Sequence, residues 1–133
     1  MRTASTVVQM VFRVAWLVQV ALGLLFWSGN AAALVPIHML IGVLLVLGLW
    51  TQAALGARAG AGWPLVAGAA VWGLVVPVFG MLQTSLLPGD AHWIVQAVHL
   101  LIGIVAIALA ELLSARVVGT RPGPWRGWAQ GGS

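Results

Sequence analysis

The sequence predicts an all-α membrane protein, a four-transmembrane-helix bundle built from two similar helix pairs with both termini cytoplasmic. Three observations support this fold class: hydrophobic residues make up 62% of the 133 residues, charged residues make up only 6%, and the hydrophobic residues gather in four long stretches. A soluble domain carries about 25% charged residues, so water is not the main solvent of this chain. Residues 1–116 are expected to form the bundle and residues 117–133 a flexible cytoplasmic tail.

Each of the four apolar stretches is close in length to the about 20 residues that a transmembrane helix needs. The spans are predicted at about 7–27, 34–55, 63–82 and 91–114. Tryptophan side chains favour the membrane–water interface, and they lie near several span ends: Trp27, Trp50, Trp63 and Trp93. The pattern therefore predicts four helices joined by short linkers.

Turn and cap residues agree with the predicted helix starts. Pro88 and Gly89 form a typical turn pair, and Asp90 is suited to cap the fourth helix. Asn30 is a candidate cap for the second helix, in which case Pro36 would kink that helix near its outer end.

The basic side chains predict the orientation of the chain. The linkers at 28–30 and 83–90 carry no positive charge, whereas the other segments hold all six arginines: Arg2, Arg13, Arg58, Arg116, Arg121 and Arg126. By the positive-inside rule, both termini and the middle linker are expected on the cytoplasmic side of an inner membrane, with the lipid bilayer around the helices. The arginines form no basic face with stacking aromatics, which argues against a nucleic-acid partner.

The composition excludes several chemistries. Cysteine is absent, which removes disulfides, thiolate metal sites and c-type haem attachment. Asp90 and Glu111 are the two acids of the sequence, too few for most hydrolytic mechanisms. No catalytic residue is assigned from the sequence.

A short motif repeats in the two halves of the chain. The segment HMLIGV at 38–43 recurs as HLLIGI at 99–104, each time in the second helix of a pair. The preceding helices align more weakly, through Trp16 with Trp72 and Gly23 with Gly80. Both halves begin on the same side of the membrane, so the repeat is parallel, with its pseudo-axis along the membrane normal.

The repeat places one histidine in each half, and an ionisable residue inside a membrane span is by default a functional candidate. The second and fourth helices of an antiparallel bundle lie diagonally opposite, so His38 and His99 can face one another through the centre, nearer the outer surface. Two neutral imidazoles in this arrangement suit the axial positions of a haem iron. His38 and His99 are therefore the predicted metal ligands.

Each of these histidines is followed one turn later by a glycine, Gly42 or Gly103. A porphyrin between helices needs the backbone close to its face, and glycine removes the side chain that would block it. The alternative is that both glycines only let helices pack closely, as small residues commonly do in membranes.

Further polar groups share a face of the fourth helix, where His92, Gln96, His99 and Gly103 follow helical spacing. His92 is a candidate to bind a haem propionate, to replace His99 as ligand, or to donate to a quinone. It can equally be an interfacial histidine beside Trp93. Gln96 is expected to hydrogen-bond either a cofactor or another helix.

The first helix carries Gln9, Arg13 and Trp16 on one side, with Gln19 at the margin of that side. Arg13 is expected to extend towards the inner surface. Glu111, near the inner end of the fourth helix, is its predicted ion-pair partner.

Four spans, histidines on separate helices and the neighbouring glycines resemble the four-helix transmembrane b-type cytochromes, in the broad manner of cytochrome b561-like proteins. The resemblance implies one haem b per chain, electron transfer within the membrane, and exchange of electrons with quinone or quinol. Many members hold two haems on four histidines, whereas this chain has one pair, so a single-haem variant is expected. The resemblance leaves open a quinol-linked oxidoreductase or a cytochrome subunit of a larger redox complex.

Two other functions remain as alternatives. One is a non-redox accessory membrane subunit or small transporter, in which the histidines serve helix packing or a proton relay. The other is a homo-oligomer that holds haem or lipid between chains. A bound chromophore would distinguish the first of these from the cytochrome hypothesis.

Overall fold

The computed structural model describes residues 2–29 and 31–119 and is all-α over these residues. Four long helices, α1 (Arg2–Trp27), α2 (Val35–Arg58), α3 (Trp63–Leu82) and α4 (His92–Gly119), are accompanied by the short 3-10 helices η1 (Ala32–Leu34) and η2 (Gln83–Ser85). The predicted four-helix fold is confirmed, and all four helices are long and apolar enough to cross a membrane. The predicted cap Asn30 and residues 120–133 of the predicted tail lie outside the described residues.

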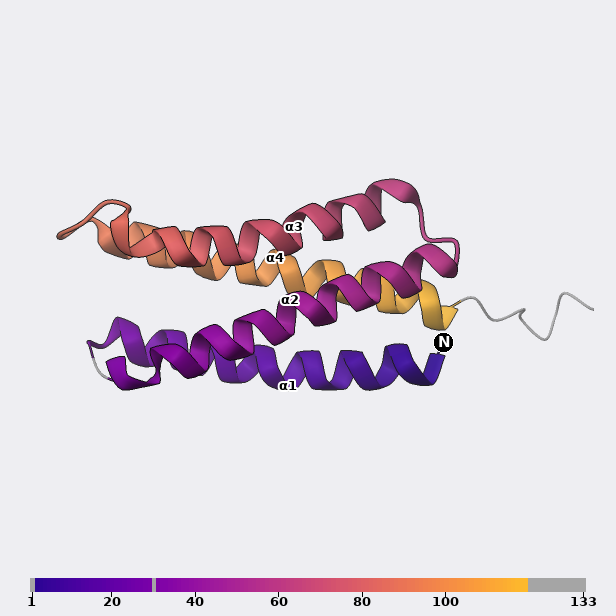
Figure 1. The fold of residues 1–133 in the computed structure, drawn as a ribbon, viewed down its shortest axis with the longest axis horizontal. Coiled ribbons are helices and arrows are strands. Elements are labelled where there is room, and N and C mark those ends of the chain that lie inside the picture. Colours follow the sequence, from indigo (N-terminus) through magenta and orange to yellow (C-terminus); the bar gives the residue numbers. More distant parts are fainter. Residues whose placement is uncertain (1, 30, 120–133) are drawn as a thin grey trace, which may run out of the picture.

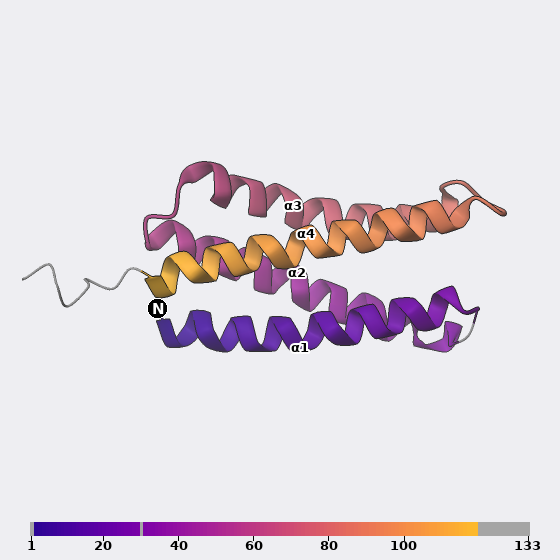
Figure 2. The same cartoon turned by 180° about the vertical axis from the view of Figure 1, so that it is seen from behind.

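The helices run antiparallel in chain order, as two hairpins, α1–α2 and α3–α4 (Figure 1). The α1–α2 and α3–α4 linkers lie at the same end of the bundle, called here the loop end. The N-terminal residues, the α2–α3 linker and the end of α4 lie at the other, called the terminal end. Both views show the two hairpins diverging towards the loop end (Figures 1 and 2). As predicted, α2 and α4 form the central diagonal pair: they contact each other as well as both remaining helices.

The helices extend beyond three of the predicted span limits. α2 continues to Arg58 rather than ending at residue 55. α1 begins at Arg2 rather than at residue 7, and α4 continues to Gly119 rather than ending at residue 114, so residues 117–119 are helical. Hydropathy misses these turns because they contain polar residues. Ser5 and Ser114 are nevertheless buried against one another, so the polar ends of α1 and α4 remain packed.

Two predicted features of the helix starts differ in the structure. Pro36 lies in the first turn of α2, where its missing N–H has no intrahelical partner in any case, so it begins the helix instead of kinking it. α4 begins at His92, whose backbone N–H donates to the Gly89 carbonyl at 3.0 Å in the preceding turn. Asp90 makes no capping hydrogen bond to the described residues. Gly89 has the positive φ of +90° that the predicted turn requires.

The apolar core lies towards the terminal end and draws on all four helices: Phe12, Leu49, Ala53, Val66, Ala69, Ala106, Ala110 and Leu113. Trp50, which we expected at the interface, helps to join α2 to α3, because its Nε1 donates to the Ala70 carbonyl at 3.1 Å and its ring fills the space beside Gly73. Outward-facing Leu, Val, Ile and Met side chains cover all four helices. Helices that are apolar on every side are typical of a protein whose surroundings are themselves apolar.

Candidate cofactor site between two histidines

A cavity of about 630 Å³ occupies the loop half of the bundle, where the hairpins diverge. Its volume lies within the about 300–1,000 Å³ of small-molecule sites in proteins. All four helices line it, and its walls are mostly apolar. The cavity brings together all six residues predicted to bind a cofactor: His38, Gly42, His92, Gln96, His99 and Gly103.

The rings of His38 on α2 and His99 on α4 lie close together beside this cavity. Their centroids are 6.2 Å apart and their planes differ by 44°. A metal ion bound between two imidazole nitrogens, each at about 2 Å, places the ring centroids about 6 Å apart. The spacing is therefore compatible with two imidazoles that share one metal ion.

Both imidazoles have unused hydrogen-bonding capacity. The Nδ1 atoms of His38 and His99 are buried and have no hydrogen-bond partner among the described residues, and the same holds for Oε1 of Gln19, which also lines the cavity. A buried polar atom without a partner costs about 1–3 kcal/mol. Three such atoms around one cavity are an expected feature of a site that binds a further molecule.

A phenylalanine supports each histidine. The Phe26 ring meets His38 edge-on at 5.3 Å between centroids, and the Phe79 ring stacks on His99 at 5.9 Å. In each hairpin, therefore, the first helix supplies a phenylalanine and the second a histidine, which extends the internal repeat. Aligning the two halves of the sequence did not reveal these residues, because Phe26 and Phe79 lie at different distances before their histidines. Their signal was one phenylalanine near the end of the first helix of each pair, Phe26 and Phe79.

Three glycines bring side chains close to the helix backbone around the cavity. A Cβ atom on Gly42 would lie 3.3 Å from Nε2 of Gln19, and one on Gly103 would lie 3.9 Å from Nε1 of Trp16. The glycine in direct contact with a histidine is Gly80, where a Cβ atom would lie 3.4 Å from Cε1 of His99. Space for a porphyrin beside Gly42 and Gly103 stays a prediction, and at Gly42 the neighbour is the flexible Gln19 side chain.

His92 and Gln96 lie nearer the loop end than His99. Nδ1 of His92 is 3.2 Å from the Leu86 carbonyl oxygen, so His92 is tied to the preceding linker. Gln96 lines the cavity and has no hydrogen bond to the described residues. Among the three histidines, the rings in mutual contact are those of His38 and His99. The geometry therefore favours His99 over His92 as the partner of His38.

A metal ion held by protein side chains alone normally has three or four of them as ligands. Within residues 2–29 and 31–119, His, Cys, Asp and Glu side chains form no group of three or more that could hold a metal ion. A haem needs only two axial ligands from the protein, because its macrocycle supplies the others. Two histidines are therefore enough for haem and too few for a typical zinc site.

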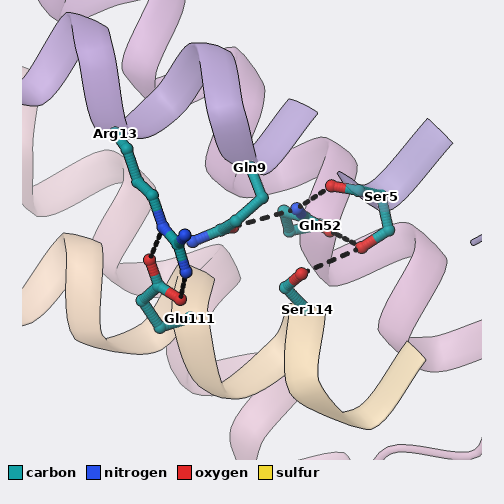
Figure 3. A network of polar contacts seen from close by, with 6 residues as sticks. All are labelled: Ser5, Gln9, Arg13, Gln52, Glu111 and Ser114. Atoms are coloured by element: carbon teal, nitrogen blue, oxygen red, sulfur yellow. Dashed lines mark hydrogen bonds and ion pairs between the residues drawn. The ribbon is translucent and has the colours of Figure 1, made fainter. Parts of the chain in front are cut away.

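A separate polar cluster lies in the terminal half, between α1, α2 and α4 (Figure 3). The Ser5 hydroxyl donates to Oε1 of Gln52 at 2.9 Å and lies 3.2 Å from the Ser114 hydroxyl. Nε2 of Gln52 donates to the Ser5 carbonyl at 3.0 Å and to Oε1 of Gln9 at 3.1 Å. Sequence reasoning did not connect Ser5, Gln52 and Ser114. The available signal was an amide, Gln52, near the C-terminal end of an otherwise apolar stretch.

The predicted ion pair between Arg13 and Glu111 is confirmed. The guanidinium donates through Nε to Oε1 at 2.6 Å and through Nη2 to Oε2 at 2.7 Å, a two-point contact between α1 and α4. Figure 3 shows the Gln9 carboxamide between this pair and Gln52. The pair therefore extends the terminal-half cluster towards the outside of the bundle.

Comparison with protein-family models, curated proteins and solved structures gives no match for this chain. Function therefore has to be argued from the site itself.

Proposed function

We propose that this protein is a haem b-binding electron-transfer protein of the membrane, in which His38 and His99 would hold the haem iron. One observation carries the proposal: the repeated histidines of the two halves meet at 6.2 Å between ring centroids beside one cavity. Haem would supply a centre that is reversibly oxidised and reduced by one electron. The single-haem cytochrome expected from the resemblance is thus the function that the site supports best.

We further propose that the helices span an inner membrane with the terminal end in the cytoplasm. Arg2 begins α1, Arg58 ends α2, and Arg116 lies in the last turn of α4, so these arginines gather at the terminal end. The linker at the loop end carries the acid Asp90. By the positive-inside rule, this distribution supports the proposed orientation, in which the histidine pair would lie in the outer half of the membrane.

The residues of the site have separate roles in this proposal. His38 on α2 and His99 on α4 would hold the haem iron, and a haem held by both would supply one-electron transfer rather than oxygen chemistry. Phe26 and Phe79 pack against the two imidazoles and fix their orientation. Mostly apolar walls exclude water, which favours electron transfer over side reactions.

Quinone or quinol is the proposed exchange partner. Gln19 and Gln96 line the same cavity with amide groups that can hydrogen-bond a quinone oxygen. A quinone reaches such a site through the lipid, since the helices around it are apolar on their outer faces.

The test is a reduced-minus-oxidised visible spectrum of protein expressed with an adequate haem supply. The wild-type chain is expected to show the split bands of a six-coordinate b-type haem. His38→Ala and His99→Ala are each expected to lose them, whereas His92→Ala retains them because His92 contacts the linker instead. A colourless wild-type protein, or unchanged bands in both alanine variants, would contradict the proposal.

A non-redox accessory subunit is the second candidate, favoured by the aromatic contacts of both histidines. In this function, His38 and His99 would serve only to pack against Phe26 and Phe79 and so join the helices of each hairpin. This function predicts no chromophore and stoichiometric co-purification with a larger membrane complex. The same purification therefore distinguishes the two candidates.

A further inference from the structure

The Arg13–Glu111 pair is exposed although it belongs to two apolar helices. The exposed fractions of the side chains are 54% for Arg13 and 38% for Glu111. On α1, the residues one turn before and after Arg13 on the outer face are Met10 and Leu17, both exposed. A half-exposed ion pair thus interrupts a surface that is otherwise made of apolar side chains.

Intramolecular contacts use only part of the hydrogen-bonding capacity of this pair. A guanidinium has five N–H donors, and the contacts with Glu111 are made through Nε and Nη2. Nη1 has no acceptor among the described residues. Lipid hydrocarbon supplies no acceptor either, and charged groups within a span normally face protein or water. The exposed side of the pair therefore calls for a polar partner.

We propose that this surface packs against the same surface of a second copy of the chain, about a two-fold axis. The surface, called here the α1/α4 face, consists of Met10, Arg13, Leu17, Ala108, Glu111 and Ala115. A two-fold interface brings identical patches together, so a patch must complement itself. This one does, because it carries one positive and one negative side chain. Rotation allows Arg13 of each copy to meet Glu111 of the other.

Small residues beside the acid permit close approach of the two copies. Ala108 and Ala115 lie one turn before and one turn after Glu111 on α4, and both are exposed. Small side chains at such positions are typical of helix interfaces in membranes, where packing and hydrogen bonds replace the hydrophobic driving force. The dimer rests on the proposed membrane span but not on the haem proposal, because neither Arg13 nor Glu111 lines the histidine cavity.

Disulfide cross-linking in native membranes tests the interface, since the natural sequence has no cysteine. Ala108→Cys on the α1/α4 face is expected to give an oxidised band at twice the 13.9 kDa of the chain. Leu74→Cys, on the exposed side of α3, is the matched control and is expected to stay monomeric. Equal cross-linking at both positions, or a monomeric detergent-corrected mass for the wild type, would overturn the proposal.

Charge reversal tests the role of the ion pair. Arg13→Glu and Glu111→Arg are each expected to weaken self-association at least about tenfold, because like charges then face one another across the axis. Coexpressed with different tags, the two variants are expected to form the mixed dimer, in which an all-acidic face meets an all-basic one. An ion pair that only reaches for the membrane surface would leave association unchanged in every combination, which would refute the dimer.

Discussion

The two halves of the bundle satisfy their buried polar side chains to different degrees. In the terminal half, Ser5, Gln52 and Ser114 are buried and hydrogen-bonded beside a packed apolar core, and one buried side-chain atom of the described residues, Nε2 of Gln9, lacks a partner. In the loop half, His38 and His99 have buried nitrogens without a partner and lie beside a cavity of about 630 Å³. The first half has the features of a rigid scaffold and the second those of a binding site that such a scaffold supports. Variants in each half test this difference.

The largest effect on stability is expected in the terminal half, from Gly73→Leu. A side chain at this position would overlap the Trp50 ring, which joins α2 to α3. Overpacking of a tight contact costs about 1–3 kcal/mol and occasionally more, and we expect the upper end here because the ring would have to leave. Unfolding in mixed detergent micelles measures the loss. Gly68→Leu is the control on the same helix, since nothing lies within 4 Å of its added Cβ, and its stability should be near that of the wild type.

The next largest loss of stability is expected from Gln52→Leu, which removes the amide at the centre of the terminal-half cluster. Ser5 and Gln9 would lose their bonds to the amide while staying buried. Stranded polar groups of this kind cost about 1–3 kcal/mol. The midpoint of detergent-induced unfolding should fall accordingly. A midpoint equal to that of the wild type would show that the cluster contributes nothing to the scaffold.

In the loop half, one substitution is expected to raise the stability of the haem-free protein instead of lowering it. His99→Leu removes a buried nitrogen that has no partner, so the haem-free protein should gain about 1 kcal/mol of stability. The same variant should lose haem binding. Measuring both properties on one preparation separates a packing histidine from a binding histidine, because a packing histidine would destabilise the protein when replaced.

The smallest effect is expected from a single methyl group beside the histidine. Gly80→Ala places Cβ 3.4 Å from Cε1 of His99, whereas Gly23→Ala, which also faces the cavity, meets nothing within 4 Å. Loss of an outer-shell hydrogen bond to a metal ligand commonly costs about 10–100-fold in affinity, and a methyl group in ordinary van der Waals contact with the ring should cost less. Gly80→Ala should therefore lower haem affinity by up to about tenfold, with Gly23→Ala unchanged. Equal affinities would show that the His99 ring moves freely.

The sequence predicted those features that depend on a local pattern or on the rarity of ionisable residues within the predicted spans. Runs of apolar residues gave the four helices, and the repeated motif gave the histidine pair, because only a few ionisable groups occur in the spans. The Arg13–Glu111 contact was predictable for the same reason: Glu111 was the one acid within a predicted span. Rare charged residues in apolar helices have few choices of partner.

Features that depend on how helices cross were not predictable. The bonds of Gln52 with Ser5 and Ser114 need three helices in register, and hydropathy treats each of these residues as a weak helix end. The phenylalanines escaped notice because their spacing from the histidines differs between the halves. The predicted cap at Asp90 is wrong because α4 begins at His92, so Ala91 takes the cap position and Asp90 lies in the preceding turn.

Titration of haemin into the purified, haem-free protein tests the central claim most directly. The absorbance of bound haem should saturate at one haem per chain in the wild type, and binding should stabilise the protein against unfolding. His99→Leu should show no saturable binding, although it folds. Absence of saturation in the wild type, or the same titration curve for both proteins, would contradict the assignment of His38 and His99 as a haem-binding pair.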